Sequence, residues 1–271
     1  MISITKTAKN HKWTLLFILS FGISMENIAQ GTSDWQLEKM PVDLETDYAL
    51  SSLPLNLRND ATVYLLDPQK GYYVARQGSN EYLCFVERTD WEWGEFRDDL
   101  YTPISFDAEG ARSIFPVCMD VAAMRASGKY KAAQIKDSII RRINTGIYKA
   151  PSKPGISYML EPVMRLYPGG PDIKEPITIS MPHYMLYAPY FSEKNTRYKQ
   201  GTDGLILANP DNAILGDGKG PFGFVIIPAS ETEKATIVED GKDLLKRLVA
   251  YKAYLKAEMV SGHHHGAAAK E

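Results

Sequence analysis

Histidine is scarce in this chain of 271 residues, which contains five. One stands near the N-terminus and three form the run 263–265, so His183 is the only histidine placed to lie in a folded body. The spacings of familiar zinc sites, His-Glu-x-x-His and paired Cys-x-x-Cys, do not occur. The sequence therefore argues against a familiar zinc centre, and any histidine chemistry of the folded part depends on His183.

An excess of charge of either sign is also missing, because 31 basic and 33 acidic residues leave a formal net charge of -2. Such a balance indicates neither nucleic acid nor an anionic membrane as a partner. Hydrophobic residues make up 44% and charged residues 24%, as is typical of a soluble globular protein. A chain of this length can bury a sizeable core.

The N-terminal segment has the layout of a secretory signal peptide. Three lysines precede the apolar run Trp13–Ile23, and small and polar residues follow it up to Gly31. The run is shorter than the span of about 20 residues that crosses a bilayer. We expect residues 1–30 to be cleaved, near Ala29 or Gln30, and the protein to be secreted or periplasmic without stable membrane insertion. An uncleaved anchor is the alternative, whereas a lipoprotein is disfavoured because no cysteine follows the run.

Only two cysteines are present, Cys84 and Cys118. Because export leads to an oxidising compartment, a disulfide between them is the favoured interpretation. Such a bridge would stabilise the fold by roughly 3–4 kcal/mol. Two buried free thiols are the alternative.

Patterns typical of strands and of helices occur in separate clusters. Three short apolar runs over residues 61–87 predict a β-meander. The acidic and aromatic segment 88–113 predicts an irregular connection with one helical turn near Ala108. Helical periodicity follows in two segments, one beginning near Pro116 and one over residues 130–146.

A second β-rich part begins at Ile156, and a strongly amphipathic helix is predicted near residues 240–258. This clustering predicts an α+β fold with a largely antiparallel sheet, a central helical pair and a C-terminal amphipathic helix. We expect residues 31–258 to form that single domain. Residues 259–271, which include the histidine triplet, are expected to be a disordered tail.

Two segments resemble catalytic or phosphate-binding motifs only in part. The glycine-rich stretch 216–223 leads into a strand-like run rather than a helix, so a turn is favoured over a phosphate loop. The stretch Gly155–Met159 begins like a hydrolase nucleophile elbow but lacks its second glycine and its helix. If Ser157 were a nucleophile, His183 would have to be its base.

Carboxylates gather around two tryptophans. Paired carboxylates beside aromatic rings are typical of sugar hydrolysis, but the spacing here specifies no geometry, and a solvated acidic loop is the favoured interpretation. The residues concerned are Asp90, Glu92, Glu95, Asp98 and Asp99, around Trp91 and Trp93.

The segment MPHYM places Met181, His183 and Met185 at alternate positions, and on an extended strand they would share one face. Two thioethers and an imidazole suit soft copper. Methionine is also a common core filler, and Pro182 disturbs the strand, so a buried structural strand is favoured. An organic ligand site is the third interpretation.

Several stretches together resemble a family of secreted bacterial proteins that has no established activity. The stretches are LRNDATVYLLD (57–67), VARQGSNEYLC (74–84), GISYML (155–160), MPHYMLYAP (181–189) and, more loosely, GPFGFVIIP (220–228). The resemblance covers roughly residues 45–228 and supplies no catalytic residues. It implies that the 78–80 turn, Cys84, Tyr158 and His183 belong to one framework.

The sequence thus predicts an exported soluble protein that acts as a binding or structural module. Its expected partner is a small molecule or an envelope component, with Tyr158 and His183 as candidate ligand-binding residues, and no motif indicates a cofactor. One alternative is a hydrolase-type enzyme that uses Asp, Glu, Tyr or His groups. The other is a copper binder that uses Met181, His183 and Met185.

Overall fold

The structure, a computed structural model, describes residues 37–167, 175–190, 206–208 and 221–257. The predicted signal peptide, the predicted tail and most of the glycine-rich stretch lie outside the described residues. Within the described ranges, no helix is both long and apolar enough to cross a membrane.

The described residues contribute eight strands to one sheet, in the order β2-β1-β3-β4-β5-β8-β10-β9, while β6 and β7 pair separately. Neighbouring strands run antiparallel, except that β1 and β3 are parallel. The fold is therefore α+β with a mostly antiparallel sheet. The strands are β1 (Thr62–Asp67), β2 (Gly71–Arg76), β3 (Leu83–Glu87), β4 (Thr102–Phe106), β5 (Ile156–Met159), β6 (Met164–Leu166), β7 (Ile177–Ile179), β8 (His183–Tyr187), β9 (Ile206–Ala208) and β10 (Phe224–Pro228).

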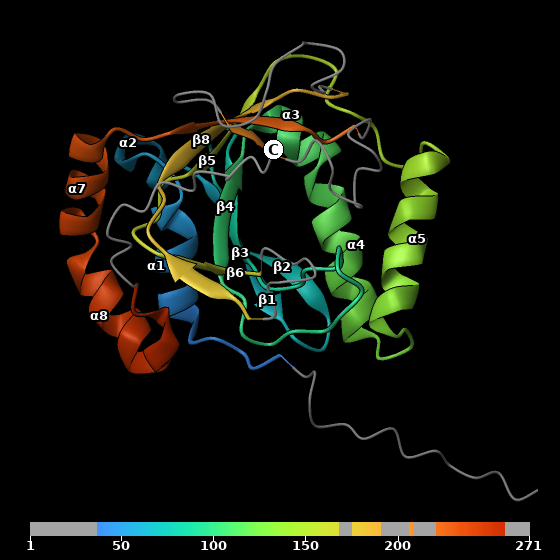
Figure 1. The fold of residues 1–271 in the computed structure, drawn as a ribbon, viewed down its shortest axis with the longest axis horizontal. Coiled ribbons are helices and arrows are strands. Elements are labelled where there is room, and N and C mark those ends of the chain that lie inside the picture. The colour runs from blue at the N-terminus through green and yellow to red at the C-terminus, as the bar shows by residue number, and fades with distance from the viewer. Residues whose placement is uncertain (1–36, 168–174, 191–205, 209–220, 258–271) are drawn as a thin grey trace, which may run out of the picture. The chain divides into compact units, whose positions relative to one another are not determined.

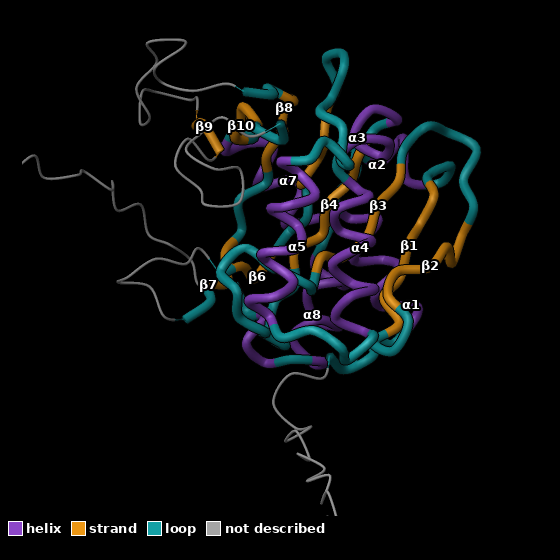
Figure 2. The backbone as a smooth tube through the Cα atoms, turned by 90° about the vertical axis from the view of Figure 1, so that its right-hand side faces the viewer, coloured by secondary structure: helices purple, strands orange, loops and turns teal. Residues whose placement is uncertain are grey.

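Helices flank the sheet, with α1, α7 and α8 on the left and α4 and α5 on the right of Figure 1. In Figure 2, β2 lies at one end of the row of strands, and β9 and β10 lie at the other. The helices are α1 (Val42–Ser51), α2 (Leu55–Arg58), α3 (Ala108–Ser113), α4 (Phe115–Ala126), α5 (Ala132–Asn144), α7 (Glu231–Asp240) and α8 (Lys242–Tyr251), followed by the short 3-10 helix η1 (Ala253–Leu255).

Two hydrophobic cores are separated by the sheet. The α4 core includes Phe85, Val121 and Ile139, and the α1 core includes residues of α1 and α8. Strand β3 serves both, because Phe85 belongs to the α4 core while its neighbours Cys84 and Val86 belong to the α1 core. This double burial explains why the run LCFV is apolar at every position rather than at every second one.

The predicted meander is wrong, because β1 lies between β2 and β3 and runs parallel to β3. Residues 77–82 carry the chain past the start of β1, where the amides of Ser79 and Asn80 donate to the carbonyl of Asp60 at 2.8 and 3.0 Å. A Cβ at Gly78 would lie 2.2 Å from that carbonyl oxygen. Glycine is therefore required where the two backbones meet.

The predicted irregular connection contains a strand, β4, that lies near the middle of the sheet. Pro103 obscures it in the sequence, since proline is rarely found in a central strand. Strand β5 pairs with β4 only at Ser105 and Phe106, so Pro103 stands beyond the part of β4 that has paired neighbours on both sides. The expected helical turn near Ala108 is the start of α3.

The predicted disulfide between Cys84 and Cys118 is also wrong. Both residues are buried free thiols, and they are not close enough to be bridged. The physical reason is the sheet itself: Cys84 belongs to the α1 core, and Cys118 belongs to the α4 core on the other face. Two buried thiols, the alternative interpretation, are what the structure contains.

Candidate functional site

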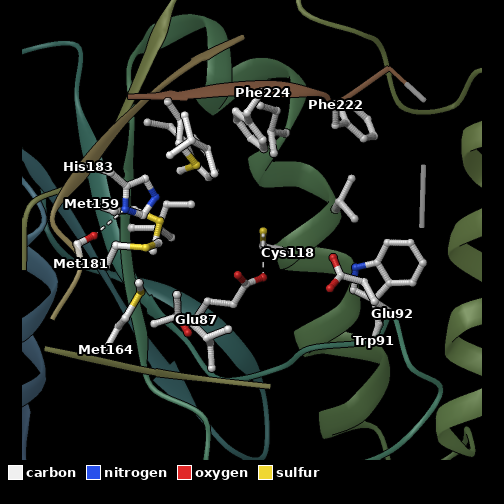
Figure 3. A pocket seen from close by; sticks show the side chains of 18 residues that line it. Glu87, Trp91, Glu92, Cys118, Met159, Met164, Met181, His183, Phe222 and Phe224 are labelled. Atoms are coloured by element: carbon white, nitrogen blue, oxygen red, sulfur yellow. Dashed lines mark hydrogen bonds between the residues drawn. The ribbon is translucent and has the colours of Figure 1, made fainter. Parts of the chain in front are cut away.

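A cavity of about 410 Å³ lies beside the α4 core, between the sheet and α4 (Figure 3). Strands β3, β4, β5, β8 and β10 and helix α4 all contribute to its lining, as does the segment that follows β3. Most of the lining is apolar, and the polar exceptions therefore stand out. The apolar side chains include Trp91, Ile104, Phe106, Ile114, Val117, Leu166, Phe222, Phe224 and Ile226.

Two carboxylates, Glu87 and Glu92, line this cavity together with the thiol of Cys118. Glu87 is the last residue of β3, and the Sγ of Cys118 donates to its Oε1 at 3.6 Å. Burial raises the pKa of Glu87 to about 7, and the nearby charge of Asp90 acts in the same direction. Burial likewise raises the pKa of Glu92 well above its ordinary value, with Asp90 as the next cause. The site thus holds carboxyl groups that retain protons near neutral pH.

Cys118 is held as a thiol rather than a thiolate. Burial raises its pKa well above the ordinary value, and the neighbouring Glu87 adds to that effect. Cys84 is similar, because burial raises its pKa to about 12. Neither cysteine has the lowered pKa that a nucleophilic cysteine requires.

A smaller cavity of about 160 Å³ adjoins the same carboxylates. Glu87 and Glu92 line both cavities, and Asp90 lines the smaller one. The Oδ1 of Asp90 accepts a hydrogen bond from the backbone amide of Glu92 at 2.9 Å, which fixes the turn that directs this segment inward. The acidic groups therefore stand between two hollow regions.

The strand wall of the cavity, formed by β5 and β8, carries His183 and methionines. His183 is 2% exposed, and its Nδ1 lies 2.7 Å from the carbonyl oxygen of Met181. Because a carbonyl only accepts, Nδ1 carries the proton and Nε2 keeps its lone pair. Burial lowers the pKa of His183, which favours this neutral form. Four of the ten methionines of the chain line the cavity: Met159, Met164, Met181 and Met185.

Tyr158 and His183, the predicted ligand-binding pair, are not brought together. In the β5–β8 register, His183 is opposite Met159, and Tyr158 is opposite Tyr184. Side chains alternate along a strand, so Tyr158 points away from the cavity that His183 lines. Its ring lies 5.8 Å from that of Tyr184 and 5.9 Å from that of Tyr82.

Ser157 does not have the surroundings of a nucleophile. Its side chain is buried, and its hydroxyl donates to the carbonyl of Ser105 at 2.5 Å. In the register of β5 with β8 it stands opposite Met185 rather than beside His183. The hydroxyl therefore ties β5 to β4.

The acidic segment is not a uniformly solvated loop. Glu95 and Asp98 are exposed, and Asp99 forms ion pairs with Arg97 at 3.0 Å and Arg165 at 3.1 Å. Glu92 alone of this set faces the larger cavity. Sequence reasoning missed Glu87, Cys118, Met159 and Met164, which come from separate elements. The one available signal was a glutamate at the end of an otherwise apolar strand.

Conventional metal ligands do not cluster in the described part of the chain. No three histidine, cysteine, aspartate or glutamate side chains there are grouped so that they could hold an ion. Methionine thioethers do not belong to that set of ligands. The predicted triplet of Met181, His183 and Met185 does line one cavity.

Comparison of the chain with protein-family models, with curated proteins and with solved structures gave no match in any of the three. The resemblance to a family of secreted bacterial proteins therefore stays a prediction. What the protein does has to be inferred from the geometry and chemistry of its cavity.

Proposed function

We propose that this chain is an exported binding protein whose cavity takes a small molecule with an apolar body and a basic nitrogen. The observation that carries the proposal is the pair Glu87 and Glu92 in a cavity with otherwise mostly apolar walls. Export rests on the predicted signal peptide, residues 1–30.

The size of the cavity suits a small organic molecule. Ligand pockets commonly enclose roughly 300–1,000 Å³, are mostly apolar and have a few polar groups that orient the ligand. The volume of about 410 Å³ falls within that range. An aromatic or aliphatic body would contact rings such as Phe106 and Phe224, which also line the cavity.

The preference for a cationic ligand follows from the absence of basic side chains in the described lining of the cavity. No lysine or arginine is among the described residues that line it. An ionised carboxylate in such surroundings is unfavourable unless a cation accompanies it. A protonated amine would supply that cation and would pull the pKa values of Glu87 and Glu92 back down. An anionic ligand would find no lysine or arginine in that described lining to accompany its charge.

A hydrolase is less well supported, because the candidate catalytic groups do not converge. Tyr158 and His183 lie on opposite faces of β5 and β8, and the hydroxyl of Ser157 is engaged by Ser105. A general acid or base must reach the proton that it transfers. The inward carboxylates are better placed to hold a charge than to act with these groups.

Three aromatic probes of the same shape test the proposal: naphthylmethylamine, naphthylmethanol and naphthoic acid. Their affinities for the full chain would be measured by isothermal titration calorimetry. We expect the amine to bind most tightly and the acid most weakly. Bound amine should also protect Cys118, which lines the cavity, from thiol reagents, while Cys84 on the other face of the sheet should be unaffected.

Variants of the two cavity carboxylates test whether they bind the amine. Glu87→Gln and Glu92→Gln should each weaken the amine by roughly tenfold, about 1.4 kcal/mol, and leave the alcohol nearly unchanged. Glu95→Gln is the matched control, because Glu95 belongs to the same segment but is exposed. Equal binding of all three probes, an amine affinity insensitive to both cavity variants, or failure of every probe to bind would overturn the proposal.

A further inference from the structure

We propose that the β5–β8 wall of the cavity is a site for one Cu(I) ion, held by the Nε2 atom of His183 and the thioethers of Met159, Met181 and Met185. The inference goes beyond the small-molecule site, because it uses a different wall and different atoms. It does not depend on Glu87 or Glu92.

Strand geometry gathers these side chains. Met181, His183 and Met185 occupy alternate positions along one chain segment, and all three line the cavity. Met159 is the cross-strand partner of His183 in the antiparallel pairing of β5 with β8. Residues opposite each other in such a pair have Cβ atoms about 4.5–5.5 Å apart. The imidazole therefore has Met185 two residues further along its own strand, Met181 just before that strand, and Met159 across from it.

The imidazole is oriented as a metal-ligating histidine would be. Its Nδ1–H is held by the carbonyl of Met181 at 2.7 Å, and Nε2 has no hydrogen-bond partner within the described residues. Metal-bound histidines commonly donate their second ring nitrogen to a carbonyl or carboxylate in this way, which fixes the tautomer. In Figure 3 the ring stands beside Met159 and Met181, with its other nitrogen toward the cavity.

The donor set selects the ion. Thioether sulfur and imidazole nitrogen are soft or intermediate ligands, and thioether sulfur selects Cu(I), whereas Mg²⁺, Ca²⁺ and Mn²⁺ prefer oxygen. An apolar wall favours a cation that needs few ligands. A purely structural wall accounts for the methionines, but it gives no role to the Nε2 lone pair of His183, a residue that lines the cavity.

The test uses the full chain with His263, His264 and His265 replaced by alanine, so that the histidine triplet does not bind copper. Cu(I) affinity would be measured by competition with bathocuproine disulfonate under anaerobic, reducing conditions, and Ag(I) would serve as a redox-inert second probe. We expect one equivalent of either ion to be retained. X-ray absorption should show both nitrogen and sulfur neighbours around copper.

Two variants and one control make the result specific. The triple change Met159→Leu, Met181→Leu and Met185→Leu conserves volume and should weaken Cu(I) binding by roughly a hundredfold. His183→Leu should remove the nitrogen signal. Met124→Leu is the control, because Met124 is buried in the same core but does not line the cavity.

Circular dichroism establishes whether each variant is folded. If His183→Leu does not fold, the triple Met→Leu variant still tests the copper site. Cu(I) retention and naphthylmethylamine binding are measured separately on the parent chain, so that the failure of either one overturns only its own proposal. No competitive retention of Cu(I) or Ag(I) by the parent chain would overturn the copper site. Equal retention by the parent and the triple variant would overturn it too.

Discussion

Glu87 provides a stability test whose sign and size follow from its place in the cavity. Its pKa is raised from 4.5 to about 7, chiefly by burial. Below about pH 4.5 the carboxyl is protonated in both folded and unfolded chains. Between that pH and about 7 the unfolded chain releases the proton while the folded chain keeps it. The free energy of unfolding therefore falls as the pH rises through this window.

The magnitude comes from the same two values. The gap between 4.5 and about 7, at about 1.4 kcal/mol for each pH unit, amounts to roughly 3 kcal/mol. Glu87→Gln removes the titrating proton, so the free energy of unfolding of this variant should fall by about that much less than the wild type's across the window. Glu45, whose pKa burial also raises to about 7, contributes equally to both proteins and cancels in the comparison.

Urea unfolding followed by tryptophan fluorescence, repeated from about pH 4 to pH 8, measures the effect. The informative quantity is the pH dependence of the difference between the wild type and Glu87→Gln, because any constant effect of the amide drops out. The free energy of unfolding of Glu95→Gln should have the same pH dependence as that of the wild type. If the curves for Glu87→Gln and the wild type were also parallel, the argument that Glu87 is buried with a raised pKa would be refuted.

Three further outcomes are expected. Dithiothreitol should leave the urea midpoint unchanged, and thiol titration of the unfolded chain should find two free thiols, because Cys84 and Cys118 are unbridged. A urea midpoint that is lower in dithiothreitol would show that the two cysteines do form a disulfide. Gly78→Ala should destabilise by about 1–3 kcal/mol or more, since its Cβ would collide with backbone, and an unchanged melting temperature would contradict the crossing. Tyr187→Phe removes a hydroxyl that donates to Asp107 at 3.0 Å and should cost roughly 1–2 kcal/mol by urea unfolding, whereas no loss would mean that the bond contributes nothing.

The elements that local patterning predicts best are those buried on one side. The sequence predicts helix α5 because Ile135 and Ile139 recur at helical spacing on its single buried face. It does not predict strand β4, because the proline of that strand contradicts the strand pattern and its place in the sheet is fixed by partners distant in sequence. The order of β1 and β3 depends on a backbone crossing that no periodicity encodes.

The site shows the same division between local and long-range information. Met181, His183 and Met185 alternate within one segment, which is local information that the sequence carries, and all three line the cavity although Met181 precedes β8. Glu87 and Glu92 meet only because the chain turns inward after β3. Pairing of Cys84 with Cys118 is prevented by the sheet, because the two residues belong to the cores on its opposite faces, and no local pattern carries that information.

The crossing of residues 77–82 past the start of β1 has a consequence for the order of assembly. The β1–β2 hairpin closes over a short turn, whereas β3 has to come around the end of β1 to reach its other edge. Loop-closure entropy favours the nearer pairing first. During synthesis, residues 62–87 can therefore complete a three-stranded unit before α4 exists, and we expect α4 to dock onto the face of a sheet whose first strands are already paired.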